Sequence, residues 1–211
     1  MTRRVAWGTD AERQASRQEV GAHLARGGIV VYPTETVYGL GCVLEAGPLE
    51  LLARFKGDRP FLVLIPGPDV AEGLRWTSAA RRLADAFWPG PLTLALTAEA
   101  GRYPPQVMGP DGAVAVRVSP HPAIPPLLAA AGGPITSTSA NAPGGTPAGD
   151  GDEAEVVARG VEGVGVAALV LDGGRLPEAR PSTIVRCDRT TRIIREGAIS
   201  RTDLESLVSL E

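Results

Sequence analysis

The chain has 211 residues, a formal net charge of −3 and 44% hydrophobic residues. This length favours one folded domain with a core that needs no cross-links, and the slightly acidic balance excludes a global attraction to nucleic acid. Two cysteines and two histidines argue against a disulfide framework, a histidine-rich zinc site and a Ser-His-Asp triad.

The first half of the chain is predicted to alternate helices with short apolar strands. Thr9 and Glu12 form a capping-box pattern, and Thr77 is a typical N-cap residue. Pro48 suits the first turn of a helix. The predicted elements are a helix over 11–26, a strand over 29–32, a helix over 48–55, a strand over 61–65, a helix over 78–87 and a strand over 92–97.

The second half continues the alternation and adds a strand pair with a turn at Asp188 and Arg189. Thr202 and Glu205 form a second capping-box pattern that predicts a final short helix. The predicted elements are strands over 113–118, 135–138, 167–171, 182–186 and 191–195, with helices from 125 and over 153–159. These elements predict an α/β fold with a mixed parallel and antiparallel sheet.

Two polar blocks directly follow predicted strands. The first, YPTETVYGLG over 32–41, combines hydroxyls and a carboxylate with glycines that allow close backbone approach. Its plain alternative is a turn whose threonines cap the next element. The second, ITSTSANAPGG over 135–145, offers hydroxyls and an amide that can cradle phosphate or ribose oxygens, but also fits an ordinary polar loop. The stretch 143–152 is interpreted as a mobile loop over a site.

A third set of candidate residues is cationic, namely Lys56, Arg59, Arg117 and Arg195, and their convergence on one cleft would indicate an anionic substrate. Lys56 and Asn141 are the only lysine and the only asparagine in a chain with twenty arginines, which suggests that neither can be replaced, although chance survival remains an equal alternative. Arg117 lies inside an apolar strand, where a charge needs a partner or a ligand.

Taken together and in order, YPTETVYGLG, FWPGPLTLAL, VAVRVSPHP, ITSTSANAPGG, STIV and IIREGA resemble the YrdC-type family over residues 20–200. The resemblance implies a twisted mixed α/β sheet flanked by helices, with a large, positively charged concave cleft. It also implies a single domain over 1–211 of the short form, without the second C-terminal domain of longer members. The start of the chain lacks an apolar stretch and no run is long enough to span a membrane, so we expect a cytoplasmic protein without membrane contact.

Family members form threonylcarbamoyl-AMP from ATP, threonine and bicarbonate, for threonylcarbamoyl-adenosine in tRNA. By resemblance, the residues expected to bind threonine are Thr34, Arg117, Ser137 and Ser182. Those expected at the nucleotide are Lys56, Arg59, Ser139, Asn141 and Arg195, with Lys56 and Arg59 also assigned the catalytic role. Mg²⁺ is expected with ATP, with no protein ligand named, and contacts with tRNA, double-stranded RNA or threonylcarbamoyl-transferase partners are expected as further interactions.

The chain departs from the family around Lys56. The family motif Lys-x-Arg-Pro here reads Lys-Gly-Asp-Arg-Pro over 56–60, and the histidine common near the end of the next strand is replaced by Leu64 and Ile65. Either Arg59 is the motif arginine displaced by one insertion, or that arginine is lost. The alternative to a synthase is therefore a paralogue that binds nucleotide or structured RNA without making the adenylate.

Overall fold

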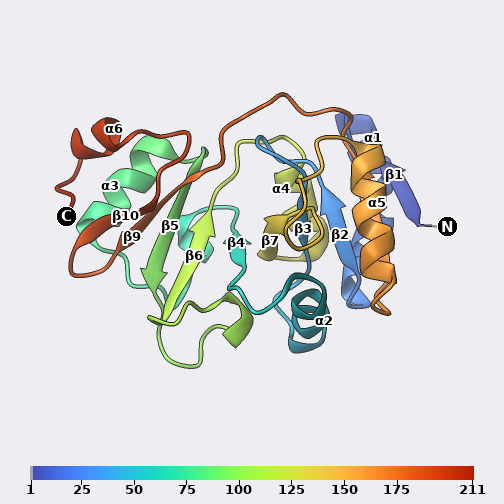
Figure 1. The fold of residues 1–211 in the computed structure, drawn as a ribbon, viewed down its shortest axis with the longest axis horizontal. Coiled ribbons are helices and arrows are strands. Elements are labelled where there is room, and N and C mark those ends of the chain that lie inside the picture. Colours follow the sequence, from blue (N-terminus) through green and yellow to red (C-terminus); the bar gives the residue numbers. More distant parts are fainter. Residues whose placement is uncertain (1) are drawn as a thin grey trace.

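The computed structural model describes residues 2–211 as helices flanking one twisted ten-stranded sheet (Figure 1). The strand order is β1-β8-β2-β3-β7-β4-β6-β5-β9-β10. The helices are α1 (Asp10–Ala25), α2 (Ala46–Lys56), α3 (Ser78–Phe87), α4 (Ile124–Ala131), α5 (Gly151–Glu162) and α6 (Arg201–Glu205). The strands are β1 (Arg3–Ala6), β2 (Ile29–Tyr32), β3 (Gly39–Gly41), β4 (Leu62–Leu64), β5 (Leu92–Thr97), β6 (Ala113–Arg117), β7 (Ile135–Ser139), β8 (Ala168–Asp172), β9 (Thr183–Cys187) and β10 (Thr191–Arg195).

Side-chain caps start the helices largely where the sequence predicts. Thr9 and Glu12 form a complete capping box at α1, and Thr77 caps α3. The predicted final short helix is present, but its predicted start is wrong: α6 begins two residues earlier, in a box formed by Ser200 and Asp203. Both residue pairs match the capping pattern, and Ser200 is the one placed by the preceding loop, where Ile199 hydrogen-bonds to Thr183 of β9.

The sheet mixes parallel and antiparallel pairs, as predicted. Two strands were not predicted: β1, which pairs in parallel with β8 at one edge, and β3, which lies between β2 and β7. β3 contains two glycines in three residues, a composition that is depleted in strands. A Cβ on Gly39 would lie 2.8 Å from the Tyr32 ring, and one on Gly41 would collide with the Thr136 carbonyl. The glycines therefore permit the close approach that the sequence indicated.

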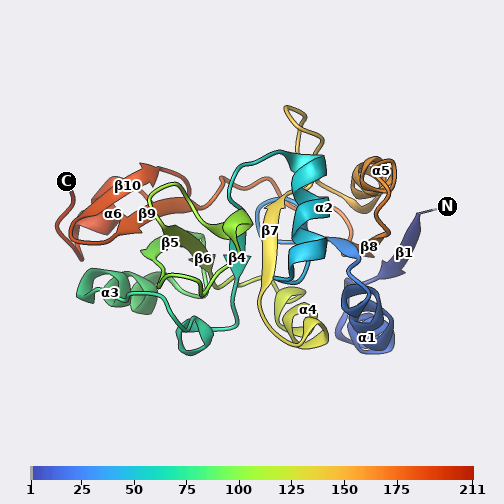
Figure 2. The ribbon, with the colours of Figure 1, turned by 90° about the horizontal axis from the view of Figure 1, so that it is seen from below.

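Alternating strand residues bury two hydrophobic clusters, one on each face of the β8–β2–β3 part of the sheet. Val30 and Tyr32 pack with α1 and α4, whereas Ile29 and Val31 pack with α2 and α5. Figure 2 shows α1 and α4 below the sheet and α2 and α5 above it. Within residues 2–211, no helix combines the length and the apolar character that crossing a membrane requires.

The segment after Asn141 is shorter than predicted and is anchored at its end. Asp150 caps α5, which begins at Gly151, so the last two residues of the predicted loop belong to a helix. Ala148 exchanges backbone hydrogen bonds with Tyr38 and Ala140, and Gly149 accepts one from Leu176. The loop is thereby tied to β3, to β7 and to the chain that follows β8.

Candidate functional site

A cavity of about 280 Å³ lies beside the loop that joins β2 to β3, over one face of β7, β4 and β9. Arg117, at the end of β6, reaches this cavity and contacts the carboxylate of Glu35 through its Nη2 atom. Its Nε also donates to the carbonyl oxygen of Gly90 at 3.1 Å. The sequence predicted that the charge of Arg117 needs a partner or a ligand. Its partner in the structure is Glu35, which belongs to the first polar block.

The electrostatic setting of Arg117 is that of a buried cation beside a second cation. Burial lowers the pKa of Arg117 to about 10, and Arg195 acts in the same direction. The group stays protonated at neutral pH because this pKa lies well above 7. Arg195 lines the same cavity and donates to the carbonyl oxygen of Ser182 at 2.9 Å. Two guanidinium groups and one carboxylate thus leave the cavity with a positive excess.

Thr34 also lines the cavity, but its hydroxyl is engaged within its own loop. It donates to the carbonyl oxygen of Val37 at 2.6 Å and accepts from the amides of Thr36 and Val37. For Thr34, the structure therefore matches the alternative interpretation of the first polar block, in which its threonines stabilise a turn. The side chain of Ser137 projects from β7 into the cavity region, and Ser182 hydrogen-bonds to Thr93 beneath it. Leu64 stands on the cavity wall, and Ile65 is buried.

The second polar block is organised by the single lysine. Lys56, the last residue of α2, donates from Nζ to the carbonyl oxygens of Ser139 and Asn141, at 3.0 and 2.9 Å, and to Asn141 Oδ1 at 3.0 Å. Asn141 Oδ1 also accepts from the Ser139 hydroxyl at 2.5 Å. Three acceptors use all three N–H donors of an ammonium group. Burial lowers the pKa of Lys56. The only lysine and the only asparagine therefore contact each other directly.

Arg59 stands at the mouth of a second cavity of about 390 Å³, which Lys56 and Asn141 also line. Its side chain is exposed, and it forms no ion pair within residues 2–211. This cavity shares Pro60, Thr138 and Ser139 with the Arg117 cavity. The two therefore adjoin, and the nine residues expected at the site line one cleft with an arginine end and a lysine end.

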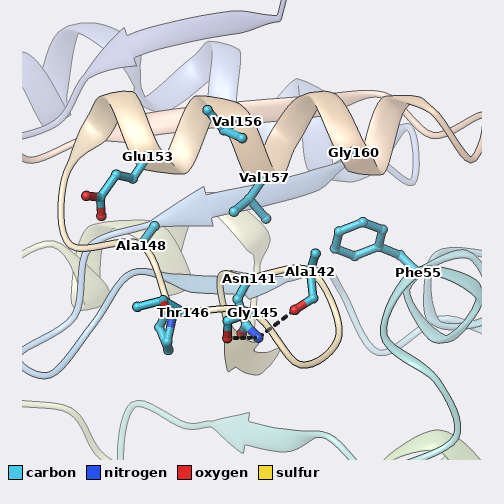
Figure 3. Close-up of a pocket in the computed structure, with 11 residues that line it drawn as sticks. Phe55, Asn141, Ala142, Gly145, Thr146, Ala148, Glu153, Val156, Val157 and Gly160 are labelled. Carbon is cyan, nitrogen blue, oxygen red and sulfur yellow. Dashed lines mark hydrogen bonds between the residues drawn. The ribbon is translucent and has the colours of Figure 1, made fainter.

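A third cavity, of about 380 Å³, also has Asn141 in its wall (Figure 3). Its wall is mainly apolar and is formed by Phe55 of α2, by Val156 and Val157 of α5, and by the loop after Asn141. The Asn141 side-chain nitrogen donates to the carbonyl oxygens of Ala142 and Gly145, at 2.8 and 3.0 Å. Asn141 therefore borders both the cleft and this apolar cavity and fixes the loop that follows it.

Glu35 and Ser119 belong to the arginine end, although sequence reasoning did not select them. Glu35 accepts from the Ser119 hydroxyl at 2.6 Å in addition to its contact with Arg117. The sequence contains only an indirect indication of Glu35: an arginine inside an apolar strand predicts a partner carboxylate but does not identify which one. Across residues 2–211, no group of three or more His, Cys, Asp or Glu side chains is placed to hold a metal ion.

Comparison with known proteins identifies the family of the chain. The sequence family Sua5/YciO/YrdC, described as "Telomere recombination", matches residues 22–197. A protein of Chromohalobacter salexigens named threonylcarbamoyl-AMP synthase is 39% identical over 171 residues, which cover 77% of this chain and 88% of the relative. One of the same name from Thiobacillus denitrificans is 33% identical over 183 residues, covering 84% and 94%.

Solved structures share the whole fold. P. abyssi Sua5 complexed with L-threonine superimposes with a TM-score of 0.84 at 26% identity over 99% of this chain. This chain spans 61% of that Sua5 chain. E. coli YciO superimposes with a TM-score of 0.82 at 24% identity, covering 97% of this chain and 100% of its own. With the family match extending from α1 through β10, the chain belongs to the Sua5/YciO/YrdC family.

Proposed function

We propose that the chain is a threonylcarbamoyl-AMP synthase, which joins L-threonine, bicarbonate and ATP to give threonylcarbamoyl-adenylate and pyrophosphate. The observation that carries this proposal is the continuous cleft with an arginine end and a lysine end. The relatives named above favour it over a paralogue that only binds nucleotide or RNA. We further propose that the adenylate serves threonylcarbamoyl-adenosine formation in tRNA in the cytoplasm.

The arginine end suits the carboxylate of threonine. A planar guanidinium presents paired N–H donors that match the two oxygens of a carboxylate. Arg117 and Arg195 line the same cavity, and Glu35 neutralises only one positive charge. Ser137 and Ser182 are proposed to supply neutral hydrogen-bonding groups for the remaining polar atoms of the substrate, whereas Thr34, whose hydroxyl is engaged within its own loop, shapes the wall of the cavity. The complex of L-threonine with P. abyssi Sua5, which has the same fold, supports this assignment.

The lysine end suits the nucleotide. Lys56 fixes the backbone of the loop over 139–141, and the Asn141 amide holds the same loop through hydrogen bonds to Lys56, Ser139, Ala142 and Gly145, so both residues are proposed to shape the nucleotide end. Ser139 also lines the cavity there, where its hydroxyl oxygen can accept a hydrogen bond. Arg59 is exposed at the cavity mouth, where its charge can meet phosphate oxygens. In this proposal Lys56 acts mainly by shaping the loop, whereas Arg59 is the motif arginine displaced by one residue and supplies the accessible charge.

In the proposed reaction, bicarbonate takes up a proton and loses water to give CO₂, and the α-ammonium of threonine releases a proton to give the free amine. The amine attacks CO₂, and loss of a further proton from its nitrogen leaves a carbamate. A carbamate oxygen then attacks the α-phosphorus of ATP, the bond to the β-phosphate breaks, and pyrophosphate leaves. The protein contributes by holding the reactants together and by neutralising charge. Mg²⁺ is proposed to enter as the MgATP substrate, because Mg²⁺ commonly binds through phosphates and water and the described residues offer no carboxylate cluster.

The test is pyrophosphate release from ATP measured with and without threonine and bicarbonate. Release that requires both compounds, together with threonylcarbamoyl-adenylate identified by mass spectrometry, is expected. Arg54→Ala serves as a matched control, because Arg54 is exposed on α2 and lines neither cavity of the cleft. Folded protein that releases no more pyrophosphate than a blank without protein would refute the proposal.

A further inference from the structure

Glu35 is the single acidic side chain that lines the arginine end of the cleft among the described residues. One of its carboxylate oxygens contacts Arg117, and the other accepts from the Ser119 hydroxyl at 2.6 Å. The side chain of Glu35 is 19% exposed, against 8% for Arg117. The carboxylate therefore faces the cavity more openly than the guanidinium beneath it and is accessible to a ligand there.

The position of Glu35 is set by the backbone of its own loop. The Thr34 hydroxyl accepts from the amides of Thr36 and Val37 and donates to the Val37 carbonyl, so that the turn carrying Glu35 is closed by three hydrogen bonds. Ser119, from the segment after β6, then fixes one oxygen of the carboxylate. Glu35 is thus a preorganised anion and not a freely moving surface charge.

The charges at this end of the cleft match an amino acid better than a simple acid. Arg117 and Arg195 attract the substrate carboxylate, but they also repel an ammonium group held nearby. The other polar side chains lining this end are hydroxyls, which carry no compensating charge. Glu35 is the one group there that can offset the charge of an α-ammonium, and it would repel a carboxylate that arrived without one.

We propose that Glu35 binds the α-ammonium group of the substrate and so selects an α-amino acid over the corresponding acid without an amine. This inference rests on the proposed function and extends it to the discrimination between substrates. Glu35 is in this view a specificity-determining residue that also positions Arg117. A purely structural role would involve Arg117 alone and would affect every carboxylate ligand equally.

The test compares L-threonine with 3-hydroxybutyrate, which has the same carboxylate and hydroxyl but no amine. Binding to the wild-type protein and to Glu35→Gln is measured by calorimetry, with thermal unfolding as the folding control. We expect the wild type to prefer threonine. In Glu35→Gln the affinity for threonine should fall about tenfold or more, as expected for loss of a charged hydrogen bond, while that for 3-hydroxybutyrate stays constant or rises.

Ser119→Ala provides a second variant, which keeps the charge of Glu35 but removes its donor partner. It should reduce the preference for threonine by a smaller factor, and it keeps the inference testable if Glu35→Gln does not fold. Equal losses for both ligands, or a wild type that binds both equally well, would overturn the role of Glu35 alone. A folded wild type that binds no threonine at all would overturn the proposed function as well.

Discussion

Replacing Lys56 by methionine should weaken ATP binding strongly while leaving the fold intact. Methionine keeps an apolar stem of similar length but removes the ammonium that holds two carbonyl oxygens and Asn141 Oδ1. A hydrogen bond to a charged group contributes about 1.5–3 kcal/mol, but the three act on one loop and are not additive. Because water can reach part of this half-buried site, we expect a total loss of about 2–3 kcal/mol, roughly 30- to 150-fold in affinity.

Lys56→Arg separates the two ways in which Lys56 can act. If Lys56 only supplies positive charge to a phosphate, arginine should retain most of the ATP affinity. If its three donors shape the loop, a planar guanidinium cannot reach the same three acceptors, and affinity should fall nearly as far as in Lys56→Met. Calorimetry at fixed ionic strength measures both variants, with Arg54→Ala as the control for loss of a nearby charge.

The expected structural signature is local. Amide hydrogen exchange should accelerate over residues 141–149 in Lys56→Met, while the midpoint of thermal unfolding changes by a few degrees at most. The ammonium lies outside both hydrophobic clusters and contacts the sheet only at Ser139, the last residue of β7. ATP affinity and loop exchange both equal to those of the wild type would refute the assignment of Lys56 to this loop.

Three further predictions concern other residues of known environment. Arg59→Ala should abolish adenylate formation, because Arg59 supplies the accessible positive charge at the cleft. It should leave thermal stability unchanged, because its side chain is exposed. A variant that still releases pyrophosphate normally would show that Arg59 is only a surface charge. Arg117→Lys should impair threonine binding far more than ATP binding, since lysine lacks the paired donors that contact a carboxylate; equal losses in calorimetry would contradict this. Burial lowers the pKa of His23 in the folded protein below its unfolded value of about 6.5. Between these two pKa values the unfolded state binds more protons than the folded state. The free energy of unfolding should therefore fall as the pH drops through 6.5 toward the folded pKa. Urea unfolding at pH 7.5 and 5.5 should show a smaller difference for His23→Gln than for the wild type, and an unchanged difference would exclude His23 as a contributor.

Much of the fold could be predicted because it depends on local patterns. The capping box at Thr9 and the N-cap at Thr77 are contained within four residues, and the apolar runs of β2 and β4 are continuous. β1 and β3 could not be predicted, because a charged four-residue edge strand and a glycine-rich three-residue strand are formed by their neighbours and not by their own propensity. At α6 two capping patterns overlap, and a contact with β9 decides between them.

The site shows the same division between local and distant information. Residue types identified Lys56, Arg117 and Asn141 as unusual, and each proves to be a hydrogen-bonded member of the cleft. Their partners could not be identified, because Glu35 lies 82 positions from Arg117 by sequence number and meets it only through the strand order of the folded sheet. A buried arginine predicts that some carboxylate is its partner. Only the order of the strands in the folded sheet identifies that partner as Glu35.

The strand order has a consequence for how activity is acquired. The cleft draws Glu35 from the β2–β3 loop, Arg117 from β6 and Ser182 from the start of β9, and these segments join only when β7 bridges β3 and β4. Such long-range pairings form slowly, because loop closure must precede the contacts that stabilise them. Neither half of the sheet supplies all of these residues, so under the proposed function threonine binding during refolding would report that β7 has joined β3 to β4 and that β6 and β9 have taken their places in the sheet.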